Sequence, residues 1–168
     1  MPLDPIFGLS ILGSFIAFGL IARIYVWPGI QTAEIYDALP LLIAPHMLRF
    51  AGLSFLELGV VSPSLPQSFA IPVAYGDLGA ALLAIAAVLA LRARASFALA
   101  ATWVFNLWGS ADLLSAYYHG VAGGLEPGSL GAAYYIPTVI VPGLLVTHAL
   151  IFALLVSRIT ATRPVESP

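Results

Sequence analysis

The feature that most constrains this chain is a series of long apolar stretches, each suited in length to crossing a lipid bilayer. A transmembrane helix needs about 20 consecutive, mostly apolar residues. The composition agrees, because the chain is 61% hydrophobic and only 8% charged, whereas a soluble domain carries about 25% charged residues. The sequence therefore predicts an all-α, polytopic transmembrane helix bundle. Its five predicted spans are residues 6–27, 38–61, 68–91, 96–118 and 132–157.

Helix-breaking residues bear on the limits of the first two stretches. We expect Trp27-Pro28-Gly29 to end the first helix, because proline lacks the amide hydrogen that a helix needs. Residues 38–61 contain Pro45, so they are predicted either to span the bilayer or to form a broken or re-entrant helix. Residues 1–159 are predicted to make a single transmembrane domain, and residues 160–168 a disordered cytoplasmic tail.

The arginines predict the orientation, because short cytoplasmic loops collect positive charge. Arg92 and Arg94 follow the third stretch, and Arg158 and Arg163 follow the fifth. Two helices separate these pairs, so both pairs face the same side. The N-terminus is then outside, the C-terminus is inside, and Arg23 lies at the inner end of the first helix. Because no cleavable signal or lipidation motif is recognised, we expect a retained first helix and a bacterial inner membrane.

Charge and composition exclude several function classes. The chain has six arginines, no lysine and a net charge of −2, so it lacks a basic patch for nucleic acid. The lack of cysteine excludes disulfides, thiolate nucleophiles and thiolate metal sites. No phosphate-binding loop, serine elbow, zinc-protease motif or dinucleotide fingerprint occurs. These absences favour a protein that is not an enzyme, and no motif identifies a family.

Several ionisable or polar side chains fall at the depth of the bilayer core. A charge at that depth costs roughly 2.5–3.5 kcal/mol on insertion scales, so such residues are functional candidates by default. Counting about 1.5 Å of rise per residue places five of these side chains within about 10 Å of depth, and Asp112 lies about a turn and a half further out. The five are His46, Arg49, Asp77, Asn106 and His148. The candidate ligand-binding residues are His46, Arg49, Asp77, Asn106, Asp112 and His148.

The simplest electrostatic arrangement pairs Arg49 with Asp77, and Asp112 is the rival partner. An ion pair in the bundle interior removes much of the cost of each charge. On an α-helix, His46, Arg49, Leu53 and Glu57 share one face. The competing interpretation is a polar contact that only fixes helix packing, since such contacts commonly join membrane helices.

Three functions are compatible with this pattern. The preferred one is binding or passage of a small polar or amphipathic ligand, or of a proton, with Arg49 attracting an anionic or carbonyl group. A second is a membrane-embedded enzyme or haem-bearing anchor, in which His46 and His148 ligate haem b or hold a metal with Asp77. A third is a non-catalytic accessory subunit, whose small-residue face on residues 68–91 packs against a membrane partner subunit. A homo-oligomer fits the first and third hypotheses equally.

His119, at the outer end of the stretch 96–118, is not a site candidate and is expected to be a surface residue.

Overall fold

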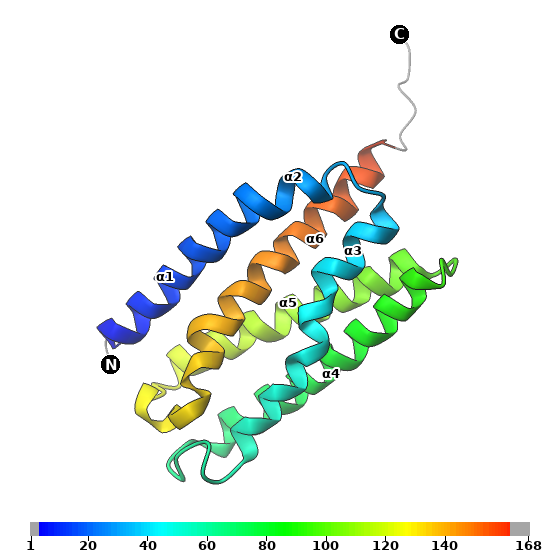
Figure 1. The fold of residues 1–168 in the computed structure, drawn as a ribbon. Helices are drawn as coiled ribbons and strands as arrows, with labels where there is room; N and C mark the ends of the chain where they lie inside the picture. The colour runs from blue at the N-terminus through cyan, green and yellow to red at the C-terminus, as the bar shows by residue number, and fades with distance from the viewer. Residues whose placement is uncertain (1–3, 162–168) are drawn as a thin grey trace.

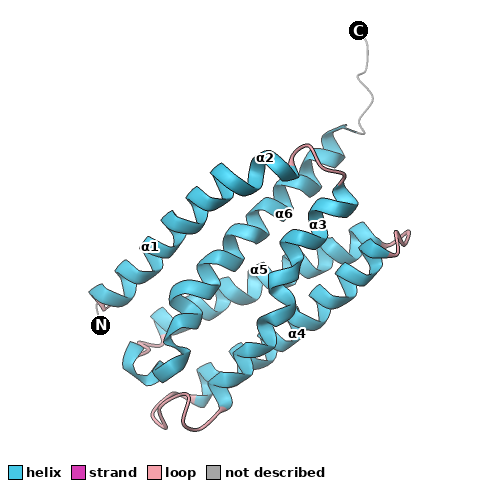
Figure 2. Ribbon diagram, viewed as in Figure 1, coloured by secondary structure: helices cyan, strands magenta, loops and turns pink. Residues whose placement is uncertain are grey.

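The protein is seen here as a computed structural model, which describes residues 4–161, with side chains described up to residue 157. This part of the chain is helical and contains no β-strand (Figure 2). Its long helices pack side by side as five rods (Figure 1). The first rod joins α1 (Pro5–Ile21), η1 (Ala22–Val26) and α2 (Trp27–Ile30), and the second joins α3 (Ile35–Ile43) and η2 (Ala44–Leu56). The others are α4 (Gln67–Arg92), α5 (Ala98–Ala122), and η4 (Ile136–Ile140) with α6 (Val141–Ala161), and the short η3 (Pro127–Tyr134) precedes η4.

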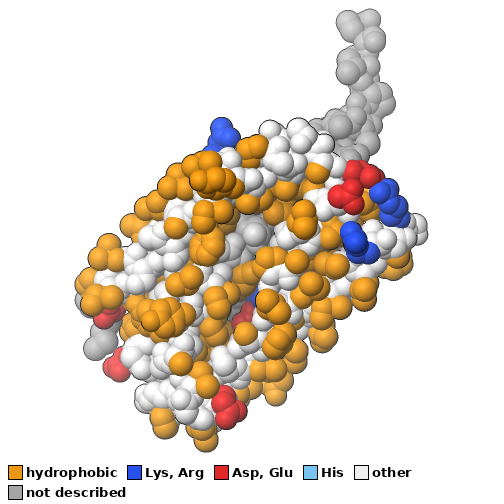
Figure 3. Space-filling model, viewed as in Figure 1, with side chains coloured by type: hydrophobic (Ala, Val, Ile, Leu, Met, Phe, Trp, Pro, Cys, Tyr) orange, Lys and Arg blue, Asp and Glu red, His pale blue; other side chains and the backbone are white. Residues whose placement is uncertain are grey.

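Four of the rods are long and apolar enough to cross a membrane, namely residues 5–30, 35–56, 67–92 and 136–157. Hydrophobic side chains are spread over the whole face seen in Figure 3, and most of the charged ones lie towards its ends. The fifth rod, α5, has 25 residues but falls outside this set, because Asn106 and Asp112 make it more polar. The all-helical class is therefore confirmed, while the number of membrane crossings stays a prediction.

The first rod does not end at Trp27-Pro28-Gly29, so that prediction was wrong. The helix continues through Pro28 to Ile30 because a π-helical turn, η1, lies directly before it. In this wide turn the amide of Trp27 donates to the carbonyl of Ala22, five residues back. Local π-helical geometry of this kind lets a helix continue past a proline.

The second rod changes character at the predicted break. The α-helix α3 ends at Ile43, and a 3₁₀-helix, η2, carries the chain through Pro45 to Leu56 without turning back. The helix does not reach residue 61 as predicted, because Glu57 is extended and Gly59 has a φ of 100°. Residues three apart eclipse one another on a 3₁₀-helix. The buried row is accordingly His46, Arg49, Gly52 and Phe55.

This 3₁₀ periodicity overturns the predicted α-helical face of η2. Leu53 is 37% exposed and Glu57 is exposed, so neither shares the buried side of His46 and Arg49. The accessory-subunit hypothesis expected the small-residue face of α4 to pack against a partner, but the structure uses this face within the chain. Its alanines, including Ala74, Ala80 and Ala84, are buried within the chain, where α4 packs mainly against η2 and α5.

One end of the bundle is fastened by an exposed ion pair. Arg94, after α4, donates from Nη1 and Nη2 to the two carboxylate oxygens of Glu34, before α3, at 2.6 and 2.8 Å. The C-terminal end of α6 lies at this same end, whereas the start of α1 and the η3 segment lie at the opposite one (Figure 1). α6 extends to Ala161, and the remainder of the predicted tail, residues 162–168, lies outside the described residues.

Candidate functional site

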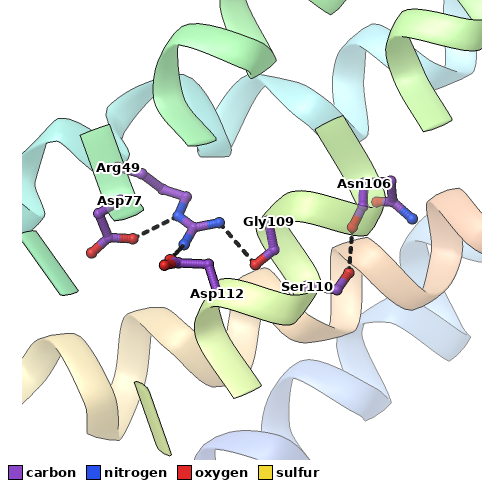
Figure 4. Close-up of polar contacts among 6 residues, drawn as sticks. All are labelled: Arg49, Asp77, Asn106, Gly109, Ser110 and Asp112. Carbon is purple, nitrogen blue, oxygen red and sulfur yellow. Dashed lines mark hydrogen bonds and ion pairs between the residues drawn. The ribbon is translucent and has the colours of Figure 1, made fainter. Parts of the chain in front are cut away.

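Arg49 lies at the centre of a buried polar cluster that joins three helical segments (Figure 4). Its Nε donates to Oδ1 of Asp77 at 2.7 Å, and its Nη2 donates to Oδ2 of Asp112 at 2.6 Å. Its Nη1 donates to the backbone carbonyl of Gly109 at 3.1 Å. The predicted pair with Asp77 is thus present, and the rival partner Asp112 is held at the same time. With all three nitrogens engaged and a side chain only 1% exposed, the guanidinium is closed off from solvent.

Three glycines provide the space for this cluster. A Cβ on Gly52 would overlap the side chain of Asp77, and a Cβ on Gly76 would overlap the carboxylate of Asp112. A Cβ on Gly109 would lie 2.7 Å from Cε1 and 2.8 Å from Nε2 of His148, and 2.9 Å from Nη1 of Arg49. Gly52 is not among the residues that the sequence singled out. Its position three residues after Arg49 becomes informative only when the segment is known to be a 3₁₀-helix.

The two inward histidines form a second polar group beside the arginine. Nδ2 of Asn106 donates to the backbone carbonyl of His148 at 3.3 Å, so its Oδ1 accepts from Nδ1 of His148 at 2.6 Å. The hydroxyl of Thr147 donates to the carbonyl of Leu144 at 2.8 Å, so it accepts from Nε2 of His46 at 2.9 Å. In the part of the chain that the structure describes, Nδ1 of His46 and Nε2 of His148 have no hydrogen-bond partner.

The histidine geometry does not suit haem. The ring centroids of His46 and His148 are 4.2 Å apart, so the rings are in contact and leave no room for a porphyrin between them. Phe105 closes the same space, with its ring centroid 5.1 Å from that of His46 and 5.3 Å from that of His148. Among residues 4–161, no three histidine or carboxylate side chains gather closely enough to hold a metal ion.

A cavity of about 290 Å³ reaches the carboxylates of the cluster from one end of the bundle. Exposed residues, among them Asp4, Val121 and Glu126, form its mouth, and Asp77 and Asp112 lie at its inner end. Between them the walls are mainly apolar and come from distant parts of the chain. They include Phe7, Phe55, Phe69, Val73, Leu113, Ala116, Tyr117, Ile136, Pro137 and Val141. We call this space the carboxylate pocket.

The carboxylate pocket divides the six predicted site residues into two groups. Only Asp77 and Asp112 line it. Arg49 lies behind these carboxylates, and Asn106, His46 and His148 are further inside the helix packing, each at most 1% exposed. His119, predicted to be a surface residue, is exposed.

A second hollow approaches the histidines from the other half of the bundle. It has a volume of about 600 Å³ and lies between the first rod, α3 and α6. Its walls are almost entirely apolar, with Thr147 and Asp37 among the few polar residues. Thr147 is also the hydrogen-bond partner of His46, so the polar residues separate two hollows.

Comparison with known proteins assigns the chain to a family but not to an activity. Residues 6–156 match the family described as a domain of unknown function (DUF8737), and the chain belongs to this family. No curated protein and no solved structure matches the chain. The match includes every residue of the polar cluster.

Proposed function

We propose that this chain is an integral membrane protein that binds a small amphipathic ligand in the carboxylate pocket. The proposal includes five spans, with α5 as the most polar, the N-terminus outside and the C-terminus inside. Four sufficiently apolar helices support it. So does the position of Arg92 and Arg94 at the end where α6 finishes, because positive loops favour the cytoplasm. A bacterial inner membrane remains the predicted location.

The single observation that carries the ligand proposal is the composition of the pocket along its length. Ligand sites are concave, mostly apolar and equipped with a few precisely placed polar groups. Here apolar walls lead to two carboxylates at the inner end. From Val121 at the mouth to Asp112, α5 advances nine residues, or about 13 Å. The polar end of a ligand would therefore lie deep in the bundle and its apolar body nearer the mouth.

In this proposal Arg49 fixes the carboxylates and does not bind the ligand. All three of its nitrogens are already donating, and its side chain is 1% exposed. An incoming anion would have to displace a carboxylate to reach it. This revises the sequence-based hypothesis that Arg49 attracts an anionic or carbonyl group. Asn106, His46 and His148 support the packing behind the pocket and do not orient the ligand.

A neutral aryl alcohol, phenylbutanol, tests the pocket without testing its charge. Gly120 lines the pocket, and a Cβ there would meet Phe69 and Leu125 at ordinary distances of 3.5 and 3.7 Å. Gly120→Phe should therefore fold and fill the pocket with its ring. Gly13→Phe is the matched control, because nothing lies within 4 Å of a Cβ on Gly13 in α1.

We expect saturation-transfer NMR in nanodiscs to show phenylbutanol binding to the wild-type protein and to Gly13→Phe, but not to Gly120→Phe. Equal signals from all three proteins would mean that the probe only partitions into lipid or protein surface. That result would contradict the proposed function.

Passage through the bundle is a second candidate, favoured by the two hollows on either side of the polar cluster. Arg49, His46 and His148 fill the space between them, and all three side chains are buried. Passage therefore requires these side chains to move, whereas binding requires no rearrangement of the helices. This difference is why binding is preferred.

A further inference from the structure

The carboxylate pocket carries only one sign of charge, and this bears on what it binds. Its charged lining residues are Asp4, Asp77, Asp112 and Glu126, all acidic. Within residues 4–161, no arginine or histidine lines it. Asp4 and Glu126 stand at the exposed mouth, while Asp77 and Asp112 stand at the buried end. A ligand therefore meets negative charge both on the way in and at its final position.

The arginine behind the pocket does not neutralise the inner end. Two carboxylates against one guanidinium leave a formal charge of −1. Asp77 uses Oδ1 for Arg49 and Asp112 uses Oδ2. Oδ2 of Asp77 and Oδ1 of Asp112 accept no hydrogen bond from any residue that the structure describes. Each of these oxygens packs on one side against a glycine, Gly52 and Gly76 respectively. The side chains of Asp77 and Asp112 are 6% and 17% exposed, and both residues line the pocket.

An unbalanced charge and unpaired acceptors at this depth are unfavourable without a partner. A cation with hydrogen-bond donors supplies both missing elements. Arg49 supplies a single positive charge, which the −1 balance already includes, and the chain contains no lysine. A cationic ligand from outside the described residues would supply this partner.

Resting on the proposed function, we infer that the ligand of the carboxylate pocket is an amphipathic monocation, namely a protonated amine on a compact apolar body. An ammonium group carries up to three donors and no acceptor, which matches the free oxygens of Asp77 and Asp112. Phe7, Phe55 and Phe69 offer ring faces and edges to an aromatic or branched aliphatic body. The cavity of about 290 Å³ is large enough for a ring with a short chain, since an engineered cavity of about 150 Å³ binds benzene.

Three isosteric probes separate charge from shape: phenylbutylamine, phenylbutanol and phenylbutyrate. At pH 7 the amine is protonated, as a lysine side chain is, whereas the second probe is neutral and the third is an anion. Dissociation constants are measured in nanodiscs, with the Gly120→Phe protein in the same lipid as the blank for partitioning. We expect the amine to bind the wild-type protein at least about ten-fold more tightly than the alcohol, and phenylbutyrate to bind least.

Asp112→Asn sharpens the test, because the amide keeps an oxygen for Arg49 and removes the excess charge. The amine should lose its advantage over the alcohol, and the affinity for the alcohol should hardly change. Asp77→Asn is the second variant and should have the same effect. The probe series on the wild-type protein tests the inference even where neither variant folds.

The possible results distinguish the two proposals. If the amine and the alcohol bind the wild-type protein equally, or if phenylbutyrate binds best, and Gly120→Phe removes that binding, the pocket is real but does not select a cation. That outcome overturns this inference and leaves the proposed function standing. If none of the three probes binds above the Gly120→Phe blank, both proposals are overturned.

Discussion

Arg49 and Arg94 both hold carboxylates through short hydrogen bonds, yet they occupy opposite environments. Arg49 is 1% exposed and joins Asp77, Asp112 and a backbone carbonyl. Arg94 is 58% exposed, holds Glu34 with two nitrogens and lies 5.2 Å over the ring of Tyr36. Hydrogen bonding to Glu34 raises the pKa of the Arg94 guanidinium above its ordinary value.

The number of hydrogen bonds therefore does not determine how much stability each site contributes. Exposed ion pairs are screened by salt and solvent, and water can solvate the charge that remains when one partner is removed. Around Arg49, water cannot take the place of a lost partner, and a single removal leaves an uncompensated charge inside the helix packing. Four predictions test this contrast, beginning with the largest effect.

Replacing the buried arginine should have the largest effect. Arg49→Met leaves Asp77 and Asp112 without their cation, and we expect it to lower the free energy of unfolding by about 3–5 kcal/mol. The measurement is unfolding in mixed detergent micelles, followed by circular dichroism. The triple variant Arg49→Met/Asp77→Asn/Asp112→Asn should recover most of the loss, because no net charge remains. A loss below about 1 kcal/mol for the single variant, as exposed pairs show, would contradict the contrast.

Crowding the buried cluster should have the next largest effect. In Gly109→Ala the new Cβ meets the His148 ring and Nη1 of Arg49 at 2.7–2.9 Å, and overpacking of this kind costs about 1–3 kcal/mol. Gly13→Ala in α1 is the matched control, because its Cβ meets nothing within 4 Å. It should be neutral or stabilise by up to about 1 kcal/mol, since alanine favours a helix. Equal melting temperatures for the two variants would show that the cluster is loosely packed.

The neutral hydrogen bonds behind the arginine should be weaker than its ion pairs. We expect a double-mutant cycle with Asn106→Ala and His148→Ala to give a coupling energy of about 0.6–1.7 kcal/mol, the range seen for polar contacts between membrane helices. A coupling energy as large as the stability lost in Arg49→Met would mean that the amide–imidazole pair contributes as much stability as the ion pairs, which would contradict the contrast. The same unfolding assay measures all four corners of the cycle.

The exposed pair should give the smallest effect. Arg94→Met should lower the melting temperature slightly at low salt and not at all at about 1 M ionic strength, where the Debye length is about 3 Å. Methionine is preferred to glycine for this test, because Arg94 has a φ of 49° and glycine would relieve the backbone as well. A loss that persists in high salt would mean that the contact with Tyr36, and not the ion pair, holds this end together.

Much of the fold followed from the sequence because hydropathy depends only on composition along the chain. The approximate positions of the rods needed no knowledge of packing, whereas the depth of Arg49, Asp77 and Asn106 in a bilayer stays a prediction. The 3₁₀ geometry of η2 could not be predicted in the same way. His46 and Arg49 are compatible with either helix type, and the choice decides whether Gly52 or Leu53 faces the bundle.

The pocket was beyond sequence reasoning for a different reason. Phe7, Phe55 and Phe69 line it from three separate segments, and an aromatic residue that faces a cavity has the same sequence signature as one that faces lipid. The sequence also could not predict that the carboxylates line the pocket while Arg49 does not, because depth along the helices does not show which of them faces a cavity. Which side of an ion pair faces open space depends on the helix packing, and here the glycines opposite each carboxylate set that packing.

The connectivity of Arg49 also has a consequence for how the protein is made. Its two acidic partners lie 28 and 63 residues further along the chain. During synthesis η2 therefore reaches the proposed bilayer before either partner has emerged from the ribosome, and its guanidinium bears the insertion penalty of roughly 2.5–3.5 kcal/mol. Only when α5 has emerged from the ribosome can Arg49 engage both carboxylates and the carbonyl of Gly109. Biogenesis is thus not finished helix by helix, and a chain interrupted before α5 is an expected substrate for membrane quality-control proteases.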